Sequence, residues 1–382
     1  VGVQRIDLET GVPENIISAG VTRCDPIRLT PWGTVIVGEE DGTDGRVFEI
    51  LDPLHTTGVI VTGAGASTTI SDPEHVARRG AIGQFAFEGL ALMPNGVLYM
   101  SDENRPGAGS PGGAIIKFIP TVPWAGGPPI TDLSQSPFFS GTLWGFRAGR
   151  RHDATDFGQG NEFGRGVWVE VPAGSDAAPT NLRGAAFDLE LTSYYRPEDM
   201  DVDNAALAAG MVRFCGTNTG EDGEDVDNHF GEVYCLTDGT IEEAGNIVLA
   251  TQTVGDVSYM LNVASVPEYQ PLLIGNLELA MMDNVAYQPG SGNWLVHEDG
   301  EGPKFSSPRN NDMWDCLDDG ADQDNQSDAC VRVMSLNDLN AEWTGGVFDA
   351  SGKHFYVSVQ HNVTGHGVIL EVTGWHDTHN NH

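Results

Sequence analysis

The sequence is poor in basic residues, poor in cysteine and free of long apolar runs, and each shortage excludes a class of protein. Lysine and arginine number 19 against 55 aspartates and glutamates, which gives a formal net charge of −36. A nucleic-acid partner requires clustered cations, so we exclude it. No run of about 20 apolar residues is present, so we expect no membrane-spanning segment. Salt-adapted solubility, extracellular calcium binding, or both, remain as explanations of the charge.

The five cysteines do not all pair. Cys215 and Cys235 lie in two strand-like runs that are able to neighbour each other, and Cys316 and Cys330 bracket an aspartate-rich loop. Two disulfides at these places predict an oxidising compartment, which makes the protein secreted or periplasmic. Cys24 is left over as a free thiol, either structural or metal-binding.

The 49 glycines and 21 prolines favour short strands joined by tight turns, and one hairpin pattern recurs. Each copy starts with an acidic residue, continues as a short apolar strand, turns near glycine, and returns through a second apolar strand. The copies span 88–103, 198–218, 283–300 and 342–362, with a divergent copy at 24–40. Further strands between them predict an all-β fold, a β-propeller of most likely six blades with inserted loops, formed by one domain over residues 1–382.

A propeller brings equivalent positions of its blades together at the central channel. The first acidic residue of each hairpin occupies such a position, namely Glu88, Glu198, Asp283 and Glu342, with Cys24 or Asp25 in the first copy. Carboxylates gathered in this way repel one another and resist ionisation, and bound cations relieve the repulsion. Alternatively, each is an ordinary strand-end residue of a very acidic protein.

Several stretches in order also resemble the PhoX-type alkaline phosphatases, a family of calcium- and iron-dependent β-propeller enzymes. The similar stretches are TPWGTVIVGEE (30–40), GQFAFEGLAL (83–92), PGGAIIKF (111–118), RPEDMDVD (196–203), DNVAYQPGSGNWLVHEDG (283–300) and EWTGGVFDASGKHFYVSVQH (342–361). The resemblance implies an exported, metal-dependent phosphomonoesterase that releases phosphate from small phosphate esters. It implies Ca²⁺ and Fe³⁺ as cofactors, because carboxylates suit calcium and a thiolate suits a softer metal.

The resemblance also implies roles for individual residues. The metal ligands would be Cys24 for iron, Glu88 and Glu198 for binding or bridging the metals, and Asp283 and Glu342 for calcium. Arg196 would hold a phosphate oxygen, so that Arg196 and Glu198 form the catalytic pair. The run DPIRL between Cys24 and the TPWGT motif is one residue longer than the family's run.

Other interpretations stay open at the level of sequence. A non-catalytic, secreted calcium-binding propeller with a structural or adhesion role would keep the fold without turnover, and a propeller lactonase would need one axial calcium and no thiolate. The segment from Asp318 to Asp328 is either a calcium clamp or a flexible acidic loop, and His361 is either a general acid or a polar strand end. The sequence does not define the oligomeric state.

Overall fold

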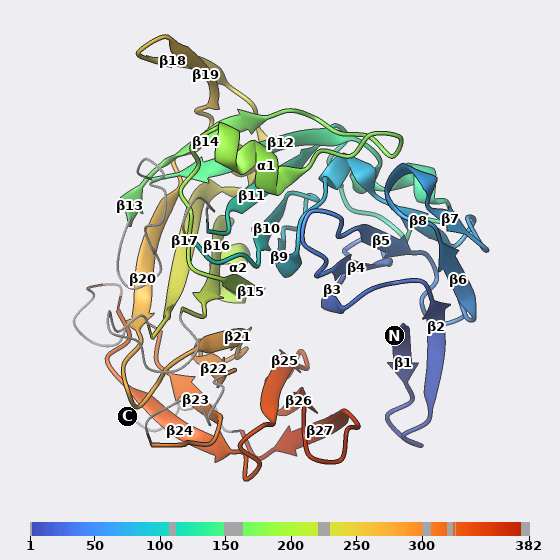
Figure 1. Cartoon of the computed structure of the whole chain (residues 1–382), viewed down its shortest axis with the longest axis vertical. Helices are drawn as coiled ribbons and strands as arrows, with labels where there is room; N and C mark the ends of the chain where they lie inside the picture. The colour runs from blue at the N-terminus through green and yellow to red at the C-terminus, as the bar shows by residue number, and fades with distance from the viewer. Residues whose placement is uncertain are drawn as a thin grey trace.

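The structure is a computed structural model that describes residues 2–106, 112–148, 163–220, 230–299, 307–318, 324 and 326–375. Five sheets are arranged as blades around a central axis, in chain order (Figure 1). One edge strand of each blade lies nearest the axis, so β3, β9, β15, β21 and β25 surround the centre. The all-β propeller predicted from the sequence is therefore confirmed.

The bounds of the blade strands follow the predicted hairpins. Blade one consists of β3 (Cys24–Leu29), β4 (Val35–Glu39), β5 (Val47–Ile50) and β8 (Val76–Arg78). Blade two consists of β9 (Phe87–Leu92), β10 (Leu98–Asp102), β11 (Ile115–Pro120) and β12 (Gly141–Arg147), extended by β14 (Val167–Val171), β19 (Val257–Asn262) and β18 (Leu249–Val254). Blade three consists of β15 (Pro197–Val202), β16 (Met211–Asn218), β17 (Glu232–Thr240), β20 (Glu268–Ile274) and β13 (Gly164–Arg165). Blade four consists of β21 (Met282–Tyr287), β22 (Trp294–Glu298), β23 (Asp312–Cys316) and β24 (Cys330–Ser335), and blade five of β25 (Glu342–Phe348), β26 (His354–Gln360) and β27 (Val368–Thr373).

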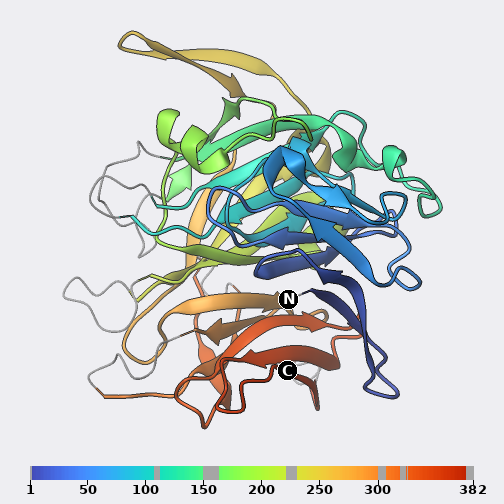
Figure 2. The same ribbon diagram turned by 45° about the vertical axis from the view of Figure 1, so that its right-hand side comes forward.

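The helices of the described residues are short and lie between strands. They are α1 (Leu182–Asp188), α2 (Asn204–Ala208), α3 (Ile241–Gly245) and the 3₁₀ turns η1 (Gly65–Ser67), η2 (Gly80–Ile82), η3 (Leu133–Gln135) and η4 (Pro137–Phe139). None of them has the length and apolar character needed to cross a bilayer. The β18–β19 hairpin projects from the body of the propeller (Figure 2).

The prediction of six blades is wrong, because the sixth sheet is not built from the recurring hairpin. It consists of β1 (Val3–Ile6), β2 (Pro13–Ala19), β6 (Val59–Thr62) and β7 (Thr69–Ile70). Its first two strands are an N-terminal hairpin, and its other two are inserted between β5 and β8 of blade one, with β6 parallel to β2. The sheet packs its apolar side chains on blade one, where Ile17 and Val61 meet Phe48. It therefore adds a layer to blade one and no acidic inner strand at the axis.

The blades are held together by apolar clusters between their faces. The inner two strands of blades two to four are buried along nearly their whole length, whereas β26 of blade five alternates between buried and half-buried residues. Trp144 and Trp168 of blade two, for example, share one cluster with Phe214 and Tyr234 of blade three, and all four side chains are fully buried. This packing fixes the inner strands relative to one another. That the whole chain forms a single domain stays a prediction.

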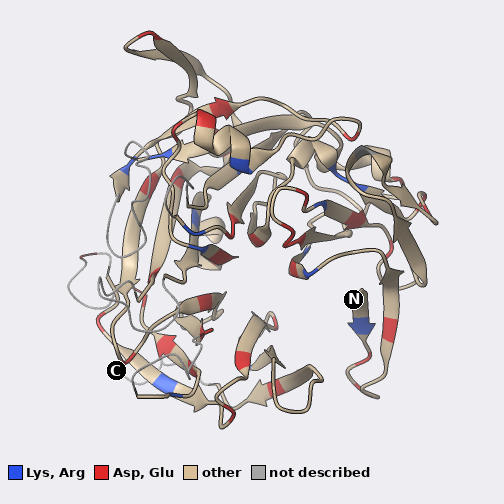
Figure 3. Ribbon diagram, viewed as in Figure 1, with Lys and Arg blue, Asp and Glu red and all other residues tan. Residues whose placement is uncertain are grey.

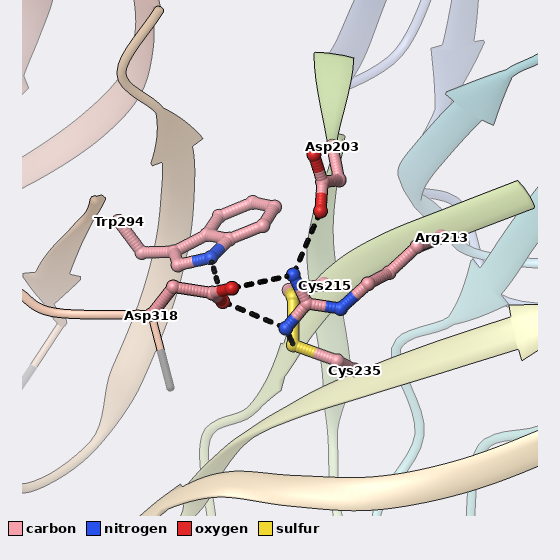
Figure 4. The surroundings of a disulfide bond; sticks show 6 residues. All are labelled: Asp203, Arg213, Cys215, Cys235, Trp294 and Asp318. Atoms are coloured by element: carbon pink, nitrogen blue, oxygen red, sulfur yellow. Dashed lines mark hydrogen bonds and ion pairs between the residues drawn. A yellow bond between two sulfur atoms is a disulfide. The ribbon is translucent and has the colours of Figure 1, made fainter. Parts of the chain in front are cut away.

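Both predicted disulfides are present, and each joins directly opposed residues of neighbouring strands. Cys215–Cys235 links β16 to β17, and Cys316–Cys330 links β23 to β24, while Cys24 is free. Figure 4 shows Arg213 beside the first bridge, with Asp318 accepting two hydrogen bonds from its guanidinium at 2.7 and 3.0 Å. Asp318 is thus engaged in an ion pair between blades. Residues 319–323 and 325 of the predicted calcium clamp lie outside the described residues.

Candidate functional site

The inner hairpins of blades one to four share the same irregularity at their axial end. In each, the inner strand has one more residue than its partner, so the pairs Cys24–Glu39, Phe87–Asp102, Pro197–Asn218 and Met282–Glu298 are followed by a β-bulge. A β-bulge bends its strand and changes the direction of a side chain. The residue that enters the bulge in each blade is acidic: Asp25, Glu88, Glu198 and Asp283.

A second set of acidic residues lies opposite the first, where the outgoing strand of the hairpin ends. The backbone N–H groups of Glu40, Glu103, Thr219 and Asp299 donate to the carbonyls of Arg23, Ala86, Arg196 and Met281, respectively, at 2.9 to 3.0 Å. These four residues therefore occupy equivalent positions, and three of them are acidic. The sequence analysis did not single out Glu40, Glu103 or Asp299. In the sequence, each of them is the second of two adjacent acidic residues (EE, DE or ED) at the end of the second strand of a hairpin, and this pattern could have identified them.

The two sets meet in one cavity of about 540 Å³ at the axis. Its charged lining comprises eight carboxylates, Asp25, Glu40, Glu88, Glu103, Glu198, Asp283, Asp299 and Glu342, and the two arginines Arg105 and Arg196. Figure 3 shows acidic segments on the inner strands around the centre of the ring. The structure thus brings together Arg196 and four of the five metal ligands predicted from the sequence.

The crowding of carboxylates opposes their ionisation. Burial, followed by the charges of Asp25, Glu198 and Asp283, raises the pKa of Glu88 well above its usual value. Burial also raises the pKa of Glu198 to about 8, although Arg196 acts in the opposite direction. Bound cations would remove both causes, because they replace water around the carboxylates and neutralise their charge.

Arg196 lies among these acids with a positive φ of 53°. Its Nε atom donates to Glu103 Oε1 at 2.8 Å, and its Nη2 atom lies 2.9 Å from Glu198 Oε1 and 3.6 Å from Asp299 Oδ2. Burial lowers the pKa of this guanidinium, but the carboxylates outweigh burial and raise it overall. The side chain is therefore a fixed cation that is held in the cavity from several blades. Backbone strain of this kind concentrates at functional sites.

Blade five contributes Glu342 in a different register, because its bulge follows later, at Gly345 and Gly346. Burial, and then a hydrogen bond and repulsion from Asp299, raise the pKa of Glu342 to about 10. His361, which lines the same cavity, places Nδ1 2.7 Å from Glu342 Oε1 and leaves 72% of its side chain exposed. The predicted general-acid candidate therefore lies at the rim of the site, and its role stays a prediction.

Cys24, the fifth predicted ligand, does not line the axial cavity. Its half-buried side chain packs against the apolar cluster between blade one and the N-terminal sheet, and it lines a separate hollow. Burial, followed by the charge of Glu39, raises the pKa of the thiol to about 12. A thiolate needs the opposite environment, one rich in positive charge. The donors of the axial cavity are therefore carboxylate oxygens.

The carboxylates of the cavity are close enough to bind a cation together. One oxygen from each of Glu40, Glu88 and Glu103 lies within 4.8 Å of the other two. Oxygen-only donor sets with several carboxylates suit calcium, which accepts six to eight oxygen ligands in flexible geometry. The donor set thus fits the calcium predicted from the sequence.

Five blades around an axial cluster of carboxylates define a β-propeller protein with a candidate metal centre. Residues 28–362 match the model of the family described as alkaline phosphatase PhoX, so the chain belongs to this family. The resemblance stated from the sequence is confirmed, and with it the function class, a phosphoric monoester hydrolase. A comparison with curated protein sequences finds no match.

A solved structure shows the same fold. Pseudomonas fluorescens PhoX in complex with vanadate, a transition state analogue, matches with a TM-score of 0.59 and 18% identity, over 93% of this chain and 70% of that chain. A glucose dehydrogenase (TM-score 0.37, 12% identity, 93% of this chain and 98% of that chain) is less similar. The PQQ-bound aldose sugar dehydrogenase of Streptomyces coelicolor is also less similar (TM-score 0.36, 13% identity, 93% of this chain and 95% of that chain). These two add no support beyond the PhoX match.

Proposed function

We propose that the axial cavity is the active site and that its carboxylates hold the calcium ions required for phosphomonoester hydrolysis. One observation carries the proposal: eight carboxylates converge from all five blades and share two arginines. An uncompensated cluster of this kind is unfavourable for folding, so it is retained for binding positive charge. The substrate of the proposal is a small phosphate ester, and Pseudomonas fluorescens PhoX binds vanadate, a transition state analogue.

In this proposal the metal ligands are Glu88, Glu198, Asp283 and Glu342, together with the newly found Glu40 and Glu103. When bound, the cations supply Lewis acidity and charge neutralisation for a phosphoryl group. The chain's own contribution is to position the ligands from rigid inner strands, where the bulges direct three of the predicted acids toward the axis. Glu198 also holds Arg196 in place through their ion pair.

Arg196 is the substrate clamp of the proposal. Its guanidinium can form two parallel hydrogen bonds to a phosphate, and it is permanently charged. The contacts with Glu103 and Glu198 orient this guanidinium within the cavity that would hold the phosphate. Arg196 therefore binds and orients the phosphate ester and stabilises the charge that develops on its oxygens.

Export and iron belong to the same proposal. The two disulfides and the family membership support a secreted or periplasmic location. Iron, as predicted from the sequence, depends on Cys24, whose side chain packs away from the cavity. Calcium is supported by the donor set, and iron has no comparable support from it.

The test of the proposal is the replacement of Arg196 by alanine. We expect Arg196→Ala to lower kcat/KM for a chromogenic phosphomonoester by about 100- to 1000-fold, because it removes one donor to the developing charge. Calcium content should stay unchanged. The matched control is Arg165→Ala, since Arg165 is 78% exposed and pairs with Glu268 on the surface.

The alternatives give different results in the same assay. Unchanged phosphatase activity in Arg196→Ala would remove this residue from the site. A wild-type protein that binds calcium and hydrolyses none of several phosphoesters would favour the structural propeller, and hydrolysis of lactones alone would favour the lactonase.

A further inference from the structure

We infer that Asp25, and not Cys24, is the blade-one ligand of the axial metal centre, which is therefore an all-oxygen site without thiolate-bound iron. The inference rests on the proposed function, because it concerns the same metal centre. It departs from the ligand set that the family resemblance implies for this chain.

The register of the hairpins is the first argument. Cys24 pairs with Glu39 as Phe87 pairs with Asp102 and as Met282 pairs with Glu298. Phe87 and Met282 are fully buried apolar residues, so this position faces the packing between blades. Asp25 follows it at the start of the bulge, in the position that Glu88, Glu198 and Asp283 occupy in blades two to four. The extra residue in the run DPIRL is thus accommodated with an acid at the ligand position.

The surroundings of the two side chains are the second argument. Cys24 packs against the apolar cluster that contains Ile17, Val37 and Phe48, on the side of the N-terminal sheet. Both residues line the hollow beside the N-terminal sheet, but only Asp25 also lines the axial cavity. Because the Cys24 side chain is not part of that cavity, a cation held by the axial carboxylates would reach its sulfur atom only after rearrangement of this strand.

The lack of a protein partner for Asp25 is the third argument. The Asp25 side chain forms no hydrogen bond or ion pair with any of the described residues. Arg28 is the nearest cation on the same strand, but its Nη2 atom donates to Asp199 Oδ1 at 2.9 Å and to the carbonyl of Met200. Asp25 thus adds an exposed carboxylate to the cavity, and the one arginine of its strand is already bound by Asp199, so its oxygens are accessible to a hard cation.

The test compares three variants of the full chain by calcium titration calorimetry after removal of bound metal with a chelator. We expect Asp25→Asn to weaken calcium binding by at least about tenfold, which is the lower range for loss of a group that supports a metal ion. Cys24→Ser should leave the calcium isotherm unchanged. Asp256→Asn, at the exposed tip of the β18–β19 hairpin, removes the same charge away from the site and should also leave it unchanged.

A second measurement separates a ligand from a merely structural residue. Without metal, Asp25→Asn should melt at a higher temperature than the wild type, since it relieves repulsion within the cluster, while added calcium should raise its melting temperature less. A structural role would lower the melting temperature with and without calcium.

The iron content of the purified protein is the measurement that could overturn the inference. Both proteins, the wild type and the Cys24→Ser variant, are expressed with iron present. The inference would be overturned, and the proposed phosphatase left intact, if the wild type retained stoichiometric iron and the variant did not. Equal calcium isotherms for Asp25→Asn and the wild type would also overturn it. Calcium binding as expected in a protein without phosphatase activity would instead contradict the proposed function and leave the assignment of Asp25 standing.

Discussion

Carboxylates that are adjacent in the sequence have different surroundings, one inside a blade and the next at the axis. The first acid of each pair at the end of an outgoing strand is buried and bound by one arginine: Glu39 by Arg46 at 2.6 Å, Asp102 by Arg183 at 2.7 Å, and Glu298 by Arg309. The second acid of each pair, Glu40, Glu103 or Asp299, lines the axial cavity, where carboxylates outnumber arginines eight to two.

This difference in surroundings distinguishes acidic residues that stabilise the fold from acidic residues that bind cations. A buried acid with its own arginine is satisfied by the protein, whereas Glu103 and Asp299 at the axis share a single arginine, Arg196, with Glu198. Removing one partner of a buried pair is strongly destabilising, because an uncompensated charge stays behind. At the axis, by contrast, removing an acid relieves repulsion in the metal-free protein and weakens the binding of the cations. Mutations of the two kinds should therefore have opposite effects on the stability of the metal-free protein.

The largest effect is expected for Glu198, which lines the cavity and contacts Arg196. We expect Glu198→Gln to reduce kcat/KM for a phosphomonoester at least about 100-fold, because it loses a metal ligand and the carboxylate that positions Arg196. The metal-free variant should be at least as stable as the wild type. Activity and calcium content are measured on the same sample, and full activity with Gln at this position would exclude Glu198 as a ligand.

A buried pair within the blades provides the contrasting case. Lys117 donates to Asp238 Oδ2 at 2.6 Å, and both side chains are completely buried. We expect Lys117→Met to lower the free energy of unfolding by about 3–5 kcal/mol. The calcium affinity of the folded protein should stay unchanged. Chemical denaturation measures the loss.

The double variant Lys117→Met/Asp238→Asn is the control for this prediction. It should recover part of the lost stability, since the asparagine oxygen can still accept from Trp168 while its amide group donates to the Tyr99 hydroxyl. A change in calcium affinity in Lys117→Met would contradict the separation of blade and axis.

The fold and the centre of the site were predictable from local patterns. The hairpins repeat with an acid at their start, and repeated units in a propeller place that residue at the axis, so Glu88, Glu198 and Asp283 could be proposed without a structure. One disulfide followed from two cysteines in neighbouring strand-like runs, and the other from two cysteines that bracket an aspartate-rich loop. These features depend on the order of residues within one hairpin, which the sequence records directly.

The remaining features depend on contacts between distant segments. The count of six blades was wrong because residues 59–70 leave blade one to pair with the N-terminal hairpin, and no local signal marks that pairing. The choice between Cys24 and Asp25 depends on a one-residue bulge, which changes the face that every preceding residue takes. Glu103 and Asp299 were missed because their roles appear only when hairpins are aligned through their cross-strand bonds.

The pH dependence of stability follows from the raised pKa values at the axis. Burial raises the pKa of Glu198 to about 8 from 4.5, and the charges of Glu103 and Asp299 add to the shift while Arg196 opposes it. The folded protein therefore binds more protons than the unfolded chain between about pH 4 and pH 8. Stability without metal should decrease as the pH rises through this range. Calcium competes with these protons, so its stabilising effect should increase over the same range.

The central claim, that the axial carboxylates exist to bind cations, is tested most directly by the melting temperature of the wild-type protein at pH 6 and pH 9, with chelator and with excess calcium. The account predicts a lower melting temperature in chelator at pH 9 than at pH 6, and a larger increase on adding calcium at pH 9. At 100 times the dissociation constant, calcium should add about 2.7 kcal/mol per site. Melting curves in chelator and in calcium that coincide at both pH values would contradict the account.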